Sequence, residues 1–260
     1  MNKTPVTVDK NGFPREFRIY FENAKIYDSS CSSDMRVYYV DKGFYIKTAK
    51  KDALKNEAEA GERFYALGIG VEIMDYISTD MDYLVTREAE GTDLTHCLDK
   101  PEMICGVLAE ALKELHVKPY GNINVSPAYA EYTELADNCD NKSFKSKAIA
   151  QVLGISDRDT AITVIKNNKD RFSADTLIHG DACLPNVIQK DGKFSTFIDF
   201  AMSGVGDKHM DLYWAIWSLW FNLKTDSYTD LLLDLYGRDN YDHELLRTVA
   251  ALETLYQEEI

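Results

Sequence analysis

Residues 177 to 200 read LIHGDACLPNVIQKDGKFSTFIDF, and this run is the most informative part of the chain. Asp181 lies in a polar turn behind two apolar residues, and Asn186 follows five residues later. An apolar strand then turns at Asp191-Gly192, and the return strand alternates apolar and polar residues until it reaches Asp199. We therefore expect a β-hairpin that brings Asp181, Asn186 and Asp199 to the same end of the ribbon.

The three oxygen-bearing side chains suit the transfer of a γ-phosphoryl group. Such a site needs a carboxylate that orients and deprotonates the acceptor hydroxyl, and hard oxygen ligands that hold Mg²⁺. Asp181 suits the first task. Asn186 and Asp199 suit the second, because one amide and one carboxylate leave coordination positions for phosphate and water oxygens. A His-Gly-Asp triplet alone also fits a hydrolase or an ordinary turn, so the prediction depends on all three residues at these offsets.

The segments HGDACLPN (179–186) and FIDFAMSGVGDKHMDL (197–212) resemble the catalytic segment of the aminoglycoside 3′-phosphotransferase family, which is related to protein kinases. The resemblance implies ATP, or GTP, as the phosphoryl donor. It also implies a catalytic base at Asp181, Mg²⁺ ligands at Asn186 and Asp199, and support of the catalytic loop by His179 and Asp211. For His179 we favour a structural role, since a histidine between an apolar residue and a glycine is more often a buried hydrogen-bonding group than a proton shuttle.

The N-terminal part of the chain reads as strands at residues 16–21, 35–40 and 44–47, the last two joined by a turn at 41–43. The third strand ends in Lys47. A lysine that ends an apolar strand is usually only exposed to solvent. Phosphoryl transfer, however, needs a cation for the α- and β-phosphates, and in kinases a lysine on such a strand supplies it. We therefore predict that Lys47 binds phosphate. In the resembling family a serine-containing loop covers the phosphates, and Ser33 falls closest to that position.

The segment from Lys51 to Leu67 has helical composition and ends before a glycine, so it can carry the glutamate that fixes Lys47. Two glutamates compete for this role. Residues 57, 60, 61, 64 and 67 or 68 share one helical face and read Glu, Ala, Gly, Phe and Leu or Gly. Glu57 therefore points inward, whereas Glu59 shares its face with charged residues.

Residues 82–91, DYLVTREAEG, give a strand followed by a glycine turn. They resemble the hinge of the same family, where backbone groups bind adenine, and the resemblance assigns that position to Ala89. Beyond it, residues 104–116 carry apolar side chains at helical spacing, which predicts a buried helix beneath the catalytic loop.

The acceptor site is open to two interpretations. Trp214, Trp217 and Trp220 lie three residues apart in a predicted helix, and such a stripe is more often core than ligand cage. The resembling family, however, places an arginine near Met202 and charged residues near Trp217, Ser218 and Phe221, so Trp217 and Phe221 are also candidates for an aromatic substrate wall. In the first case acidic residues between Tyr132 and Asn141, and the C-terminus, are left to bind amines.

Composition narrows the class of protein. The chain has 260 residues, 45% of them hydrophobic, with no apolar run of membrane-spanning length and no secretory signal at its start, so we expect a cytoplasmic protein. Its five cysteines are widely spaced without a C-x-x-C pair, which predicts free thiols. A net charge of −14 argues against nucleic acid as a partner and permits a cationic small molecule.

These observations predict an α+β, two-lobed, protein-kinase-like fold, with a β-rich nucleotide-binding lobe over residues 1–90, a hinge near 86–91 and a mainly helical lobe over 91–260. The predicted function is Mg·ATP-dependent phosphorylation of a hydroxyl on a small, cationic acceptor, an aminoglycoside first. A choline-like, macrolide or sugar acceptor, and a nucleotide-binding pseudokinase, are the alternatives. Ala201, where the family and protein kinases usually carry glycine, leaves the metal ligand Asp199 in place.

Overall fold

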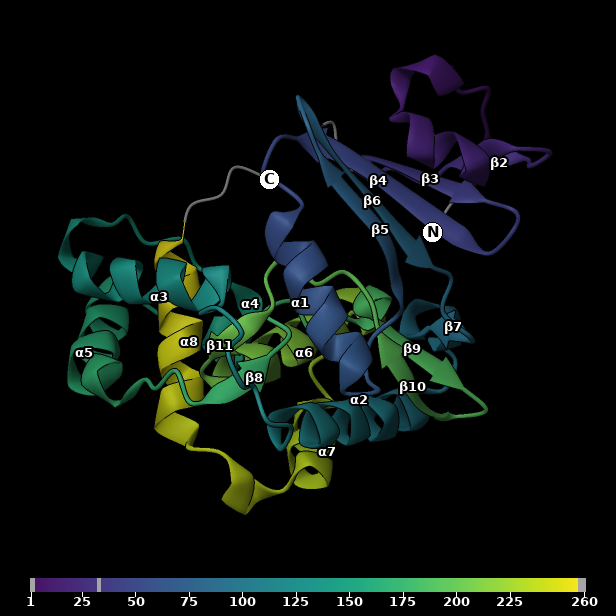
Figure 1. The fold of residues 1–260 in the computed structure, drawn as a ribbon. Coiled ribbons are helices and arrows are strands. Elements are labelled where there is room, and N and C mark those ends of the chain that lie inside the picture. Colours follow the sequence, from purple (N-terminus) through teal and green to yellow (C-terminus); the bar gives the residue numbers. More distant parts are fainter. Residues whose placement is uncertain (1–2, 32–33, 257–260) are drawn as a thin grey trace. The chain divides into compact units, whose positions relative to one another are not determined.

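The computed structural model describes residues 3–31 and 34–256, and the chain divides into two compact units (Figure 1). Unit 1 contains the chain up to Glu90 together with Phe197–Ala201, and unit 2 contains Gly91–Thr196 and the chain from Met202 onward. The sequence predicts a lobe boundary near residue 90 and the whole of 91–260 in the C-terminal lobe, whereas unit 1 also contains the short segment 197–201. It joins unit 1 because the Phe197 amide donates to the Ile69 carbonyl (2.9 Å).

Unit 1 is built on an antiparallel sheet of six strands in the order β1-β2-β3-β4-β6-β5, counted over the described residues (Figure 1). The strands are β1 (Thr4–Pro5), β2 (Ile26–Asp28), β3 (Arg36–Val40), β4 (Phe44–Lys50), β5 (Ile73–Ser78) and β6 (Met81–Arg87). The predicted strands at 35–40 and 44–47 are confirmed as β3 and β4, and β4 continues three residues past Lys47. This extension places Lys47 inside a paired strand, opposite Leu84 of β6.

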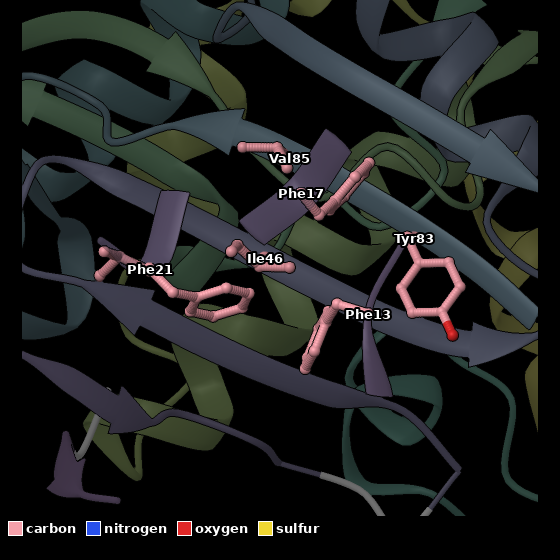
Figure 2. Packing of buried hydrophobic residues seen from close by; sticks show 7 residues of the cluster. Phe13, Phe17, Phe21, Ile46, Tyr83 and Val85 are labelled. Atoms are coloured by element: carbon pink, nitrogen blue, oxygen red, sulfur yellow. The ribbon is translucent and has the colours of Figure 1, made fainter. Parts of the chain in front are cut away.

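The predicted strand at residues 16–21 is wrong. This segment is a 3₁₀ helix, η2 (Arg15–Phe21), preceded by a shorter one, η1 (Lys10–Gly12). The apolar residues at 17, 19 and 21 alternate as in a strand, but only Phe17 and Phe21 are fully buried, whereas Ile19 between them is 65% exposed. Together with Phe13 they pack on the sheet around Ile46 and Val85, as Figure 2 shows. The sheet face is therefore covered by aromatic side chains of the N-terminal segment.

The helix of unit 1, α1 (Lys55–Ala66), begins four residues later than the sequence suggested. Residues 51–54 form a turn instead, because the buried carboxylate of Asp82 accepts the Leu54 amide (2.9 Å) and fixes the chain there. The buried face of α1 contains Glu57, Gly61 and Phe64, in agreement with the predicted wheel. Gly68 adopts a positive φ of +75° just after the helix and ends it.

Unit 2 is mainly helical. Its helices are α2 (Pro101–His116), α3 (Pro127–Asp137), α4 (Ala148–Val152), α5 (Arg158–Asn168), α6 (Lys208–Leu223), α7 (Thr229–Tyr236) and α8 (His243–Leu255). Its strands are β7 (Thr92–Asp93), β8 (Thr176–Ile178), β9 (Val187–Lys190), β10 (Lys193–Phe197) and β11 (Gly204–Gly206). Five 3₁₀ turns connect them within the described residues: η3 (Leu94–Cys97), η4 (Cys139–Asn141), η5 (Lys169–Arg171), η6 (Leu184–Asn186) and η7 (Arg238–Asn240).

The core of unit 2 lies between its long helices. The predicted apolar stripe of α2 is confirmed, since Ile104, Leu108 and Leu115 are fully buried. Helix α8 packs against α5 and α6 in this core (Figure 1). The predicted hairpin is also confirmed as β9 and β10, whose turn residues Asp191 and Gly192 both adopt positive φ. Over the described residues, the longest apolar helices fall short of what spanning a membrane requires.

Candidate active site

The predicted catalytic loop, residues 179–186, connects β8 to β9 and carries Asp181 and Asn186. The side-chain amide of Asn186 donates to the Asp181 carboxylate (Nδ2 to Oδ2, 2.9 Å) and to the Asp181 carbonyl (3.0 Å). The two predicted site residues are therefore bonded to each other. Gly180 has a φ of +78°, and a Cβ atom there would lie 2.2 Å from the Met202 carbonyl oxygen, so only glycine fits this turn.

A buried carboxylate on α6 holds the start of this loop. Asp211 is fully buried, and its two oxygens accept the backbone amides of His179 and Gly180, each at 2.8 Å. The ring of His116 on α2 also bonds Asp211, with Nε2 at 3.1 Å from Oδ2. An ionised carboxylate only accepts hydrogen bonds, so Nε2 carries the proton. The other ring nitrogen, Nδ1, bonds the Tyr236 hydroxyl at 2.9 Å.

His179 is itself fully buried and acts within the loop. Its Nδ1 accepts from the Asp181 amide (3.3 Å), and its carbonyl accepts from the Ser203 hydroxyl (2.8 Å). The ring thus binds a backbone amide of its own loop, and the carbonyl is bound by Ser203. Both contacts suit a structural residue.

Two residues that support the loop were missed by the sequence reading. His116 lies 95 positions before Asp211 in the chain, and its place at the end of the α2 stripe gave no sign of this contact. Ser218 had been considered only as a substrate position. Its buried hydroxyl instead accepts the Leu184 amide (2.9 Å), which fixes the middle of the catalytic loop to α6.

The second group of predicted residues lies in unit 1 and centres on Lys47. Its ammonium is 2.5 Å from Glu57 Oε1 and 2.7 Å from Asp199 Oδ1. Glu57 is 1% exposed, whereas the competing Glu59 is half exposed and lies 3.9 Å from Lys55. Of the two candidates, Glu57 is the one that contacts Lys47.

Burial and charge act in opposite directions in this cluster. Burial alone lowers the pKa of the Lys47 ammonium, but the carboxylates of Glu57 and Asp199 outweigh it and raise that pKa above its usual range. Burial raises the pKa of the Glu57 carboxyl, against the attraction of Lys47. Within the described residues Glu57 Oε2 has no hydrogen-bond partner, so Lys47 is its main stabilising contact. Lys47 is thus held as a cation.

Two further residues, Ala89 and Ser33, were assigned from the family resemblance. Ala89 lies in the connection that follows β6 and is partly exposed. The adjacent residue Glu88 is tied to the sheet by a bond from its amide to the Gly43 carbonyl (2.9 Å). Ser33 lies outside the described residues.

The donor atoms of the loop and of Asp199 fit a magnesium ion by their chemistry. The amide nitrogen of Asn186 donates to Asp181, so the amide oxygen is the atom of this side chain that could bind a metal ion. Asp199 offers a carboxylate at a residue with a φ of +70°. Hard oxygen donors of these two kinds are what Mg²⁺ prefers.

A pocket of about 270 Å³ lies beside Asp181 in unit 2. It is lined by Ala128, Glu131, Tyr132, Lys145, Lys147, Gly180, Asp181, Met202, Trp214, Glu253 and Tyr256. Its lining contains one tryptophan of the stripe together with a residue of the acidic region and residues of the C-terminal stretch. Trp214 lines it, whereas Trp217 stacks on Phe221 (centroids 5.0 Å apart, planes 13° apart) away from the lining. All three tryptophans are only partly buried, so the stripe is not a sealed core.

Two of the acidic residues between Tyr132 and Asn141 are paired with lysines. Asp137 pairs with Lys169 and Asp140 with Lys166, each at 2.6 Å. Besides Asp181, the carboxylates that line the pocket come from Glu131 on α3 and from Glu253 on α8, and Glu253 lies in the C-terminal stretch that was a candidate to bind amines. Its partners Tyr132 and Lys147 could not be expected from the sequence, because they come from α3 and from the segment before α4.

Comparison with solved structures gives the class of the fold. Over 96% of this chain and 99% of that one, it matches the aminoglycoside phosphotransferase APH(3'')-Id from Streptomyces rimosus with a TM-score of 0.71 at 18% identity. The structure of that enzyme with ADP and streptomycin matches with a TM-score of 0.61 at 18% identity, over 85% of this chain and 90% of that one. The two-lobed, kinase-like fold expected from the sequence is confirmed.

Sequence comparison gives the family. A model of the phosphotransferase enzyme family matches residues 33–247, and the chain belongs to this family. A protein named probable aminoglycoside 3'-phosphotransferase from Lactococcus lactis is 33% identical over 97% of this chain and 98% of its own length. The aminoglycoside 3'-phosphotransferase of Niallia circulans is 27% identical over 68% of each chain. The resemblance drawn from the catalytic segment is confirmed, and the protein is a phosphotransferase.

Proposed function

We propose that this protein transfers the γ-phosphoryl group of Mg·ATP to a hydroxyl of an aminoglycoside. The observation that carries the proposal is the Asp181–Asn186 pair, whose Asp181 lines a pocket that contains further carboxylates. A base next to a metal ligand suits phosphoryl transfer, and carboxylates in the pocket suit a cationic acceptor. The names of the relatives, and the ADP and streptomycin bound to one structural neighbour, support the same choice of donor and acceptor.

Asp181 is the residue that we assign as the base. Its carboxylate lines the pocket, where it can accept a proton from the acceptor hydroxyl and aim the oxygen at phosphorus. The bond from Asn186 holds the carboxylate in one orientation, and the bonds of Asp211 to the loop hold its backbone. The base is therefore ordered before the acceptor binds, so its conformational entropy is not lost during the reaction.

Lys47, Glu57 and Asp199 form the phosphate-handling group. A permanently charged Lys47 is suited to the α- and β-phosphates, and Glu57 keeps it in position. Asn186 and Asp199 are the residues that we assign as Mg²⁺ ligands. When bound, the ion neutralises the charge that develops on the phosphate oxygens. Ser33 and Ala89 keep their proposed roles in covering the phosphates and binding adenine.

A coupled ADP-release assay tests the proposal. The purified protein is offered ATP and Mg²⁺ with aminoglycosides, macrolides, choline and neutral sugars, and Asp181→Asn serves as the matched inactive control. We expect acceptor-dependent ADP release with aminoglycosides, abolished in the control. Turnover with choline, macrolides or sugars alone would show that the acceptor is not an aminoglycoside. Tight ATP binding without turnover of any acceptor would indicate a pseudokinase.

A further inference from the structure

The pocket beside Asp181 contains an ion pair that no proposed step uses. Glu253 of α8 is 2% exposed, and Lys147 places its ammonium 2.6 Å from Glu253 Oε2. The Tyr132 hydroxyl donates to the other oxygen, Oε1. Both oxygens of the Glu253 carboxylate are therefore already bonded within the protein.

Lys147 is held in this position by its own chain segment. It precedes α4, and two residues earlier the Lys145 amide donates to the Thr254 carbonyl at 2.7 Å, which ties the segment to α8 next to Glu253. The Lys147 side chain remains 27% exposed, so its ammonium faces both the carboxylate and the pocket. A lysine in this setting occupies the place that an ammonium group of a ligand would take.

We propose that Lys147 is a specificity-determining residue that competes with the ammonium groups of the acceptor for Glu253. The inference rests on the proposed function, since it concerns the same pocket and a cationic acceptor. An acceptor ammonium reaches Glu253 only by displacing Lys147, and the gain is then the difference between two similar charge-assisted bonds. The pocket therefore favours acceptors whose ammonium groups fall elsewhere, for example near Glu131, over those that require Glu253.

Removal of the lysine charge should reverse this preference. In Lys147→Met the buried Glu253 loses its cation, and an unpaired buried carboxylate binds an incoming ammonium strongly. We expect the dissociation constant for kanamycin, measured by titration calorimetry with ADP present, to fall about tenfold, the ratio expected for one charge-assisted hydrogen bond. Binding of the uncharged trisaccharide raffinose should not change between wild type and variant.

Three control variants separate this effect from general electrostatics and from misfolding. Lys145→Met removes an equal charge from the same pocket but leaves the Lys147–Glu253 pair, so it should change kanamycin binding less than about threefold. Adding Glu253→Gln to Lys147→Met should abolish the gain. Lys147→Gln keeps a donor for Glu253 and serves, with a smaller expected gain, if Lys147→Met does not fold.

Several results would overturn the inference. They are equal kanamycin affinity in wild type and in the folded Lys147 variant, an equal gain in Lys145→Met, a gain that persists with Glu253→Gln, and no kanamycin binding by any of the proteins. Failure of the proposed function has a different signature. In that case kanamycin binds and responds to Lys147→Met, but no aminoglycoside supports ADP release by the wild type.

Discussion

Replacement of Asp211 by asparagine tests how the catalytic loop is held. The carboxylate accepts two buried backbone amides at 2.8 Å, and asparagine can accept only one of them with its remaining oxygen. The other amide, from His179 or Gly180, then faces an NH₂ group and loses its partner. A hydrogen bond to a charged group contributes about 1.5–3 kcal/mol, and an orphaned buried donor costs about 1–3 kcal/mol, so we expect a loss of about 3 kcal/mol in unfolding free energy.

The measurement is urea unfolding of wild type and Asp211→Asn, followed by single-turnover phosphoryl transfer. The control is Asp175→Asn, because Asp175 is an exposed aspartate just before β8 and should change the unfolding free energy by less than about 0.5 kcal/mol. Transfer should also slow in Asp211→Asn, since the freed backbone carries Asp181. An unchanged urea midpoint together with wild-type transfer would refute the idea that Asp211 fixes the loop.

The other predictions concern the base, the loop and acid stability. Asp181→Asn should bind ATP normally but lower single-turnover transfer about 10²- to 10⁴-fold, and wild-type transfer would exclude it as the base. Ser218→Ala orphans the buried Leu184 amide and should lower the unfolding free energy by about 1–3 kcal/mol in urea unfolding; no loss would mean that water replaces the hydroxyl. Burial acts to raise the pKa of Asp82, but hydrogen bonds from Leu54 and other donors lower it, so its contribution to stability is present above about pH 4 and is lost as pH falls through the lowered value. The difference in urea midpoint between wild type and Asp82→Asn should therefore shrink between about pH 6 and pH 3, and a constant difference would contradict this reading.

Local patterns were sufficient where one face of an element decides its partners. The wheel of α1 selected Glu57 over Glu59, because an inward carboxylate on an otherwise apolar face must meet a cation, and Lys47 lies 2.5 Å away. The Asp191-Gly192 turn predicted the hairpin because both residues tolerate positive φ.

Patterns failed where tertiary packing overrides local preference. The run at 15–21 has strand-forming residues at alternate positions, but Pro14 precedes it, and Ile19 is exposed between the buried Phe17 and Phe21. Its conformation depends on the sheet face that it covers, which is formed by strands later in the chain. Sequence-local reasoning contains no information about that surface.

The donor and acceptor sides of the chemistry differ in how far they can be read from sequence, and the reason is physical. Asp181 and Asn186 are five residues apart, so a short motif fixes their bond. The acceptor pocket joins Tyr132, Lys147 and Glu253, which are up to 121 positions apart, and its charge depends on an ion pair that no motif encodes. A single substitution at Lys147 changes that charge without touching the loop. Phosphoryl-transfer chemistry is therefore tied to the motif, whereas acceptor preference depends on contacts that only the folded chain creates.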